Sequence, residues 1–473
     1  MYPETNNAHA HDLQMDLVTA SNEVIPIFGK RASKYSLWIR FSNGHKFKDG
    51  EEFAKLIVPV NGDRAKLGPC RLLSEPNIDG YAGRITFIDD FFDFDNLLSN
   101  HKIVKLQSEF LNLPMVLAHK DNITREFKDY TSNLNYDCNV YKNLFDKLDM
   151  EYQGEPEDVK KLVQRAIIDS EGKTFLRFID ENLQKLEKIV KNFSKEEHER
   201  HGFYLRKQLW NIIMCSAFMA RTNLKPRGYS GDSEMMRMIY ANEYEGFSTF
   251  SKLLNKHPLD QPGSQAVRNR RTIVAAKLNE IKNSCRDQAD GKCRVLSVAC
   301  GPAFELKDIF VSPDDCDAFH FTLLDQDKSA LLEASVLVDQ IEKSQGRALE
   351  TKYLNESVRT MLVTSDLHEK WGRFDFIYSM GLFDYLTPPV ASAVLKKLYQ
   401  LLAPGGEMVI GNYHVSNPNR YYMEYWLDWV LYYRSESEFK ALLGDAPGAH
   451  MDVSFDDTGV QMFLEVKKNQ ANP

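Results

Sequence analysis

Short apolar runs, each ending in small or polar residues, follow one another through the last part of the chain. A helix is expected directly after the first run, and the second run ends in an acidic residue. This order predicts an α/β fold that binds a nucleoside at the carboxyl ends of its strands. The runs are Val295–Val298, Phe321–Asp325, Leu362–Leu367, Phe374–Leu386 and Leu401–His414.

The first run leads straight into a turn of small residues, Ala299–Ala303. Small side chains let the backbone approach a ligand, and glycine adopts dihedral angles that other residues avoid. The N–H groups that open the following helix then face the ligand. Such a turn is weak evidence alone, but Asp325 follows about twenty residues later, where a carboxylate holds ribose hydroxyls in nucleoside-binding folds.

With these motifs in this order, residues 265–473 resemble class I S-adenosylmethionine-dependent methyltransferases. The Pro404–Gly406 turn before the last run is similar to the turn before that family's fifth strand. The resemblance implies a Rossmann-like sheet and S-adenosylmethionine as cofactor. The chain departs from the family at Ser297, where an acid is common, and at Ala299 and Ala303, where glycine is common. A nicotinamide-binding fold, or a fold that has lost its ligand, is the alternative.

The resemblance also implies roles in donor binding. Asp325 would hold the ribose, Gln326 would lie against the adenine, and Asp366 would bind the adenine amino group. The backbone of the first turn and the end of the fourth run would contact the rest of the donor. The expected donor-binding residues are Ala299, Cys300, Gly301, Ala303, Asp325, Gln326, Ser365, Asp366, Leu367, Ser379, Met380 and Gly381.

Methyl transfer from a sulfonium is an in-line displacement, so the protein must bind the donor, orient the acceptor and exclude water. A carboxylate acceptor needs no base, whereas a hydroxyl or ammonium group is helped by one with a near-neutral pKa. His414 and Tyr413, after the fifth run, are the candidate catalytic residues, and Tyr229 is a third. A structural hydrogen bond is the plainer interpretation of His414.

Between the two ends of the chain the apolar period is helical, as in Val159–Ile167. One polar stretch, Asn223–Glu234, contains a proline, two glycines, Arg227 and Tyr229 between two apolar helices. Ordering such a loop is costly unless it has a role. It is either an interhelical turn or a lid that covers the donor pocket and touches the donor or the acceptor.

Three arginines, Arg268, Arg270 and Arg271, begin the next helix. They form either a solvated face or a clamp for a carboxylate or phosphate, because the planar guanidinium matches those groups. The Arg-Gly-Tyr-x-Gly-Asp loop and the Arg-Asn-Arg-Arg helix together resemble bacterial proteins described as 3-hydroxypalmitic acid methyl ester biosynthesis proteins. This resemblance implies a hydroxy fatty acid carboxylate as acceptor.

The acceptor is expected to contact residues from three places in the chain. Asp384 follows the fourth run, and an aromatic stretch follows the fifth. That stretch is either plain packing or an apolar wall for an acyl or aromatic acceptor. The expected substrate-binding residues are Arg227, Arg270, Asp384, Tyr421 and Tyr425.

Residues 1–95 are expected to form a small all-β domain after a loose leader of about 25 residues. Its predicted strands are Ser36–Phe41, Ala54–Val60 and Gly83–Ile88. The piece Lys66–Leu72 resembles an N-terminal barrel similar to PilZ domains. Neither cyclic di-GMP motif of those domains is found, so a structural or partner-docking barrel is expected.

Composition narrows the class of protein. The chain has 473 residues, is 43% hydrophobic and carries a formal net charge of −8, which is typical of a globular protein and unlike a duplex nucleic-acid binder. Seven cysteines without a Cys-x-x-Cys pair suggest neither disulfides nor a zinc site, and no metal site is expected. The longest apolar run, Leu209–Ala220, is too short to span a bilayer. No signal peptide is visible, so a cytoplasmic protein is expected.

The sequence thus predicts a small β-barrel (1–95), a helical lid or substrate domain (96–264) and a methyltransferase domain (265–473). The expected partner is a small-molecule acceptor, without nucleic acid, and a homo-oligomer is left open. Two alternatives remain: methylation of an amine or protein side chain, and a sensor that binds the donor or a nucleotide without turnover.

Overall fold

A computed structural model describes residues 13–33, 36–41, 47–60, 63–74, 83–88, 119–285, 291–444 and 446–470. The chain divides into two compact units, Met1–Asn122 and Ile123–Pro473. We call them the N-terminal unit and the C-terminal unit and describe each by itself. The predicted helical and methyltransferase segments both fall in the C-terminal unit.

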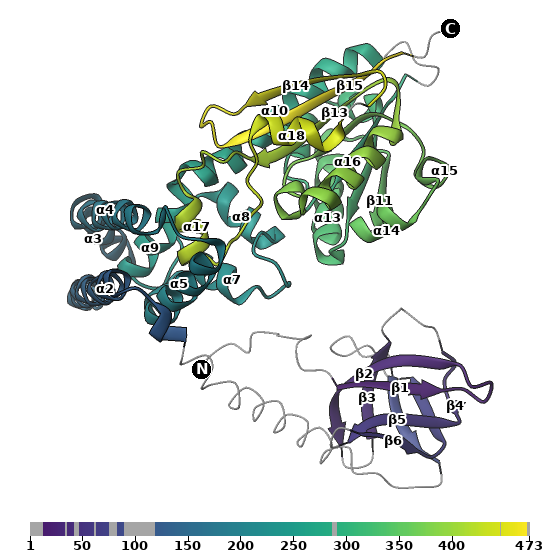
Figure 1. Cartoon of the computed structure of the whole chain (residues 1–473), viewed down its shortest axis with the longest axis horizontal. Coiled ribbons are helices and arrows are strands. Elements are labelled where there is room, and N and C mark those ends of the chain that lie inside the picture. The colour runs from purple at the N-terminus through teal and green to yellow at the C-terminus, as the bar shows by residue number, and fades with distance from the viewer. Residues whose placement is uncertain are drawn as a thin grey trace. The chain divides into compact units, whose positions relative to one another are not determined.

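The N-terminal unit is an eight-stranded antiparallel sheet with the order β4-β7-β8-β3-β2-β1-β5-β6 (Figure 1). A 3-10 turn, η1 (His119–Asn122), ends its described residues. The strands are β1 (Leu13–Val18), β2 (Val24–Ser33), β3 (Ser36–Phe41), β4 (Glu51–Phe53), β5 (Lys55–Val60), β6 (Asp63–Leu67), β7 (Cys70–Ser74) and β8 (Gly83–Phe87).

All three predicted strands of this unit are present, but the prediction of a loose leader is wrong beyond residue 12. Leu13, Met15 and Leu17 alternate along β1 and are buried, so this segment is a core strand. Within the described residues, β4 and β6 lie at the two ends of the strand order and do not pair with each other. Closure into a PilZ-like barrel therefore remains a prediction. The predicted helical run from Leu97 to Phe110 lies outside the described residues.

The C-terminal unit begins with helices that share one apolar core. Phe127, Phe145, Phe175 and Phe250 are all fully or almost fully buried in it, which bears out the helical period of the sequence. The helices are α2 (Arg125–Glu151), α3 (Glu157–Ile167), η2 (Ile168–Gly172), α4 (Lys173–Val190), α5 (Lys195–Gln208), α6 (Trp210–Ile213), α7 (Ala217–Leu224), α8 (Ser233–Ala241), α9 (Thr249–Asp260) and α10 (Pro262–Cys285).

The rest of this unit is a seven-stranded sheet with the order β11-β10-β9-β12-β13-β15-β14. The first five strands are parallel, and β15 pairs antiparallel with β13 and β14, so the predicted closing hairpin is confirmed. The strands are β9 (Cys293–Val298), β10 (Phe319–Asp325), β11 (Thr351–Asn355), β12 (Phe374–Ser379), β13 (Leu402–Tyr413), β14 (Ala449–Phe455) and β15 (Gln461–Lys468).

This sheet is Rossmann-like, because the strand order reverses between β9 and β12, and ligands of such sheets bind outside the carboxyl ends at that point. The third predicted run is wrong as a strand: Leu362–Leu367 spans the end of one helix and the start of the next, and β11 takes its place. The helices of this part are α11 (Leu306–Ile309), α12 (Pro313–Ala318), α13 (Lys328–Gln345), α14 (Val358–Val363), α15 (Leu367–Trp371), η3 (Phe383–Tyr385), α16 (Pro388–Leu401), α17 (Arg420–Trp426) and α18 (Glu436–Leu443).

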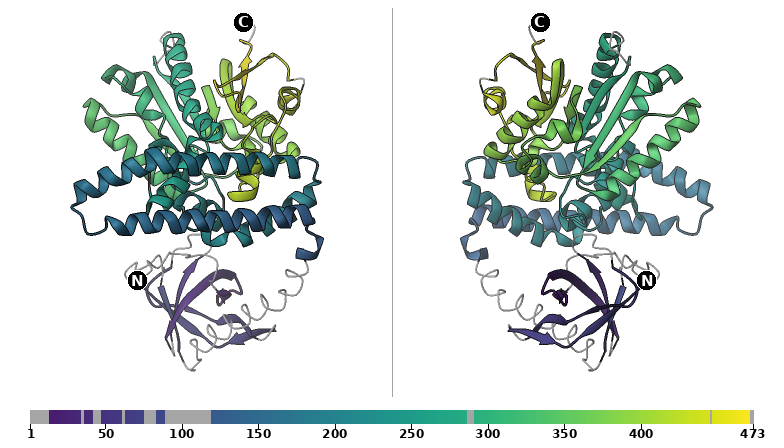
Figure 2. Two further views of the ribbon diagram at one scale, coloured as in Figure 1. Left: turned by 90° about the vertical axis from the view of Figure 1, so that its left-hand side faces the viewer. Right: turned by 90° about the vertical axis from the view of Figure 1, so that its right-hand side faces the viewer.

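Figures 1 and 2 show the helices α2 to α9 gathered across one end of this sheet, while α10 runs back along it. Helix α17, inserted after β13, joins the helical side, where Tyr425 and Trp426 are fully buried in the helical core. The helices and the sheet are thus joined twice, through α10 and through α17. In the described part of the chain, we find no helix with the length and apolar character needed to span a bilayer.

Candidate functional site

A cavity of about 270 Å³ lies at the carboxyl ends of β9, β10, β12 and β13, next to α8 and α10. Aromatic, aliphatic and charged side chains share its wall. It is lined by Tyr229, Gly231, Ser233, Met236, Tyr240, Val267, Arg270, Arg271, Val274, Ser297–Glu305, Leu324, Asp325, Gln326, Glu356, Ser357, Val358, Met361, Tyr378, Met380, Gly381, Leu382, Asp384, Tyr385, Tyr413, Trp429 and Leu431.

The turn after β9 forms one wall of this cavity. Ala299, Gly301 and Ala303 have φ angles of 53°, 55° and 51°, so three alternate residues adopt the left-handed conformation. This conformation costs a residue with a Cβ about 1–2 kcal/mol, and small side chains keep the wall close to backbone. The turn is held to the next strand because the N–H of Cys300 donates to the Leu324 carbonyl oxygen at 3.1 Å.

Asp325 ends β10 beside this turn and is 7% exposed. The N–H groups of Gly301 and Asp327 donate to its two carboxylate oxygens at 2.8 and 2.9 Å. Burial raises the pKa of Asp325, and these two hydrogen bonds oppose the rise. Each carboxylate oxygen keeps a free lone pair, so the fixed carboxylate can accept two further hydrogen bonds from a ligand.

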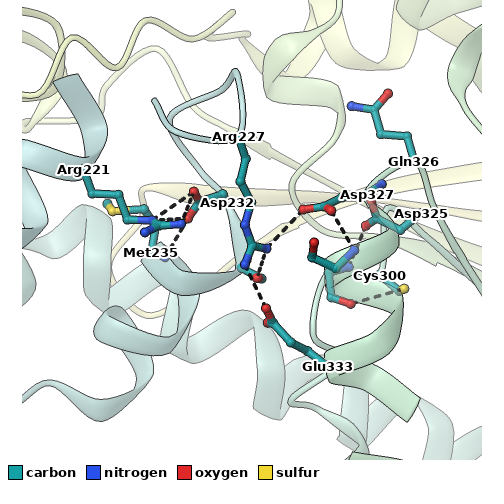
Figure 3. Close-up of polar contacts among 12 residues, drawn as sticks. Arg221, Arg227, Asp232, Met235, Cys300, Asp325, Gln326, Asp327 and Glu333 are labelled. Carbon is teal, nitrogen blue, oxygen red and sulfur yellow. Dashed lines mark hydrogen bonds and ion pairs between the residues drawn. The ribbon is translucent and has the colours of Figure 1, made fainter. Parts of the chain in front are cut away.

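The loop between α7 and α8, residues 225–232, reaches over to the sheet. Figure 3 shows Arg227 pointing from this loop to α13, where it donates to Asp327 at 3.1 Å and to Glu333 at 3.0 Å. At the other end of the loop, Asp232 accepts two hydrogen bonds from Arg221, at 2.8 and 2.9 Å, and caps α8. The loop is therefore tied to both layers that border the cavity.

The tip of this loop packs tightly against the acceptor side of the cavity, which is the side formed by Asp384, Tyr385, Tyr413, Trp429 and Leu431. A Cβ at Gly231 would lie 2.5 Å from Tyr385 Oη and 3.2 Å from Trp429 Cζ2. Trp429 Nε1 donates to Tyr385 Oη at 2.8 Å. Glycine at position 231 is thus required by close approach. Tyr229 lies near Asp325 and Asp327, whose charges, together with burial, raise the pKa of its hydroxyl.

The three arginines of α10 have different surroundings. Arg268 donates to the carbonyl oxygens of Ile239 and Leu259, and Arg271 is paired with Asp308. Arg270 lines the cavity and donates to the Met380 carbonyl oxygen at 3.1 Å. Within the part of the chain that the structure describes, no carboxylate forms an ion pair with Arg270.

Two carboxylates also face the cavity. Glu305 accepts a hydrogen bond from the Tyr378 hydroxyl at 2.7 Å. Burial raises its pKa, and the Tyr378 hydrogen bond and the charges of Arg270 and Arg271 lower it. Asp384 is 4% exposed, and one of its oxygens accepts from the Tyr413 N–H at 2.7 Å. Burial raises the pKa of Asp384 to about 6.

Most of the residues singled out in the sequence line this one cavity. They are Tyr229, Arg270, Ala299, Cys300, Gly301, Ala303, Asp325, Gln326, Met380, Gly381, Asp384 and Tyr413. Ser379 is buried just behind the wall, where its hydroxyl donates to the Val298 carbonyl oxygen at 2.9 Å. Their roles toward a ligand stay predictions.

The other predicted residues lie away from the cavity wall. His414 contacts Ser416 and Phe455 instead. The remaining residues serve structural contacts, exposed turns or apolar cores. They are Arg227 in the loop just described, Ser365 and Asp366 in an exposed turn, Leu367 in a core under the sheet, Tyr421 stacked on His198, and Tyr425 hydrogen-bonded to His198.

The sequence analysis missed Glu305, Tyr378, Glu356 and Ser357, which all line the cavity. Glu356 and Ser357 follow β11 and so occupy the place assigned to Ser365 and Asp366. Tyr378 lies inside an apolar strand, where a tyrosine is read as core. An acid directly after a small-residue turn, as at Glu305, is a signal that could have been used. No cluster of three or more potential metal ligands occurs among the described residues.

A scan against models of protein families finds no match, and a search of curated proteins finds none. Among solved structures, the chain is similar to a possible exported protein from Bordetella parapertussis (16% identity, 63% of this chain, 97% of that chain, TM-score 0.40). It is also similar to magnesium protoporphyrin IX methyltransferase from Synechocystis with bound SAH (11%, 43%, 86%, 0.31). A third similar structure is the N-methyltransferase NodS from Bradyrhizobium japonicum in complex with S-adenosyl-L-homocysteine (14%, 44%, 89%, 0.29). We therefore base the function on the cavity itself.

Proposed function

We propose that this chain is an S-adenosylmethionine-dependent methyltransferase that acts on a small-molecule acceptor inside the C-terminal unit. The observation that carries the proposal is Asp325. It lies at the tip of the second strand of a Rossmann-like sheet, fixed by two backbone N–H groups beside a turn of small residues. This is the arrangement that holds the ribose of a nucleoside at the carboxyl edge of such a sheet.

The residues present fit an adenosine-containing donor. Asp325 offers acceptors for two ribose hydroxyls, and the 299–303 turn lets a ligand approach the backbone closely. Leu324, Val358 and Met361 give the neighbouring wall an apolar surface suited to a planar base. Glu356 and Ser357 add polar groups that can hydrogen-bond that base.

When bound, S-adenosylmethionine supplies an electrophilic methyl group on a sulfonium. A lone pair of the acceptor forms the new bond to the methyl carbon, and the electron pair of the broken carbon–sulfur bond stays on the sulfur. The chain's own contribution is to orient the two reactants and to exclude water. The loop tip at Gly231, packed on Tyr385 and Trp429, serves that exclusion.

Two classes of acceptor are each supported by one observation. Arg270 has no ion-pair partner among the described residues, and this supports a carboxylate, as in a hydroxy fatty acid. Asp384 has a pKa of about 6 and supports an amine or hydroxyl acceptor. Such an acceptor loses a proton on methylation, and Asp384 would receive it.

The test is donor binding followed by turnover. We expect calorimetry on the full chain to detect binding of S-adenosylhomocysteine, the demethylated product. We also expect radiolabelled methyl groups to pass from S-adenosylmethionine to a compound in a cell extract. Failure to bind either donor form would end the proposal. Tight binding without turnover on lipid, amine or protein fractions would leave the sensor alternative in its place.

A further inference from the structure

Two opposite charges in the cavity have unused bonding capacity. The guanidinium of Arg270 carries five N–H donors. Its hydrogen bonds go to the Met380 carbonyl oxygen at 3.1 Å and to Met236 Sδ at 3.2 Å. Neither partner is charged, and the neighbouring arginine that also lines the cavity, Arg271, already has Asp308. Arg270 is therefore the arginine of α10 that is available for an anionic group.

Glu305 is the matching anion. Its Oε1 accepts from the Tyr378 hydroxyl at 2.7 Å, which fixes the carboxylate and leaves the second oxygen toward other partners. The charge of Arg270 acts on Glu305 and lowers its pKa against the effect of burial, so the two side chains face each other. They are not in contact as an ion pair, because no such pair within 4.0 Å occurs between these two described residues. A space between a fixed cation and a fixed anion suits a zwitterion.

The two charges also lie at a useful distance from Asp325. Tyr378 is on β12 and Met380 directly follows it, whereas Asp325 ends β10. Strand β9 separates β10 from β12, so the ends of these two strands are about 10 Å apart. The thioether chain of an adenosyl amino acid covers a comparable length, from its ribose hydroxyls to its α-carbon.

We propose that Glu305 and Arg270 form a binding site for an α-amino acid, with Glu305 holding the ammonium and Arg270 the carboxylate. The inference rests on the proposed function, since the amino acid is taken to be the far end of the donor bound by Asp325. Tyr378 is a positioning residue that orients Glu305. Arg270 is then occupied by the donor, and Asp384 is the charged group left to the acceptor. This favours an amine or hydroxyl acceptor over a carboxylate.

Two ligands separate this inference from the proposed function. S-adenosylhomocysteine carries the α-amino acid, and methylthioadenosine is a related nucleoside without it. We expect the full-length chain to bind S-adenosylhomocysteine more tightly in calorimetry. Glu305→Gln keeps an oxygen for the Tyr378 hydroxyl and removes the charge. It should weaken binding of S-adenosylhomocysteine by about 10- to 100-fold and leave methylthioadenosine unchanged.

Asp325→Ala is the comparison variant, because it should weaken both ligands. Tyr378→Phe, which keeps the ring, should reproduce a weaker form of the Glu305→Gln effect and guards against a folding defect. The inference is overturned if Glu305→Gln binds S-adenosylhomocysteine like the unaltered chain, or loses both ligands equally. If the unaltered chain binds neither ligand, the proposed function fails as well.

Discussion

At the scale of single residues, Asp325 carries most of the donor proposal. Asp325→Ala should reduce the binding free energy of S-adenosylhomocysteine by about 1.5–3 kcal/mol, as for the loss of hydrogen bonds to a charged group. Asp366→Asn is a matched control, because Asp366 is exposed and lies outside the cavity wall. Calorimetry on both variants checks this. Equal affinities for Asp325→Ala and the unaltered chain would contradict the ribose-binding role.

Asp384 should impose a pH dependence if the acceptor carries a proton. Its pKa is raised from 3.8 to about 6 by burial, so the carboxylate is available as a base above that pH and is lost as the pH falls through it. We expect kcat/KM to rise through about pH 6. In Asp384→Asn we expect this rise to be absent and turnover to fall by about 10²–10⁴-fold. An unchanged profile in the variant would favour a carboxylate acceptor.

The same shift has a consequence for stability. Because the folded chain holds this proton more tightly than the unfolded chain, the contribution of Asp384 to stability is present below about pH 4. It is lost as the pH rises through about 6. Asp384→Asn should remove this dependence, which urea unfolding at several pH values measures. The outcome against it is a variant whose unfolding free energy varies with pH in the same way.

At the scale of elements, the 225–232 loop is the part that closes the cavity. In Gly231→Ala the new methyl group would meet Tyr385 Oη and Trp429 Cζ2, and the loop or the tyrosine must move. We expect a loss of about 1–3 kcal/mol in unfolding free energy, as for overpacking, together with weaker donor binding. Gly154→Ala, in a turn with no atom within 4 Å of the new Cβ, is the control and should be nearly neutral.

The elements also show what the sequence could and could not predict. Asp325 was found because an acid ends an apolar run, a pattern that is local in sequence. Strand β11 was missed because it is an edge strand of Thr-Lys-Tyr-Leu-Asn with no buried residue, so no hydrophobic pattern marks it. Without β11, the residues after Leu362 were assigned to the donor in place of Glu356 and Ser357.

Other residues depended on contacts between distant segments. Tyr425 falls in the aromatic stretch proposed as an acceptor wall, but its hydroxyl meets His198, 227 positions away. His414 ends the fifth strand as predicted, yet its ring lies against Phe455 of the closing hairpin. Periodicity gives the element and the face of such a residue. It does not give the partner, which only tertiary packing decides.

At the scale of the whole molecule, the C-terminal unit holds the entire cavity wall, from Tyr229 to Leu431. A fragment covering residues 123–473 should therefore bind S-adenosylhomocysteine with nearly the affinity of the full chain. A large loss of affinity in this fragment would mean that the N-terminal unit contributes to the site.

A fragment starting at the predicted boundary, residues 265–473, should behave differently. It lacks Tyr229, Met236 and Tyr240 of the cavity wall, and it exposes the aromatic side of α17, where Tyr425 and Trp426 are fully buried against the helices. Burial of each such aromatic side chain is worth about 1.5–3 kcal/mol or more, so this fragment should be insoluble or unfolded. Circular dichroism and calorimetry on both fragments compare the two. A folded 265–473 fragment with unchanged donor affinity would show that the helices are dispensable, and the loop at 225–232 would then have no part in closing the site.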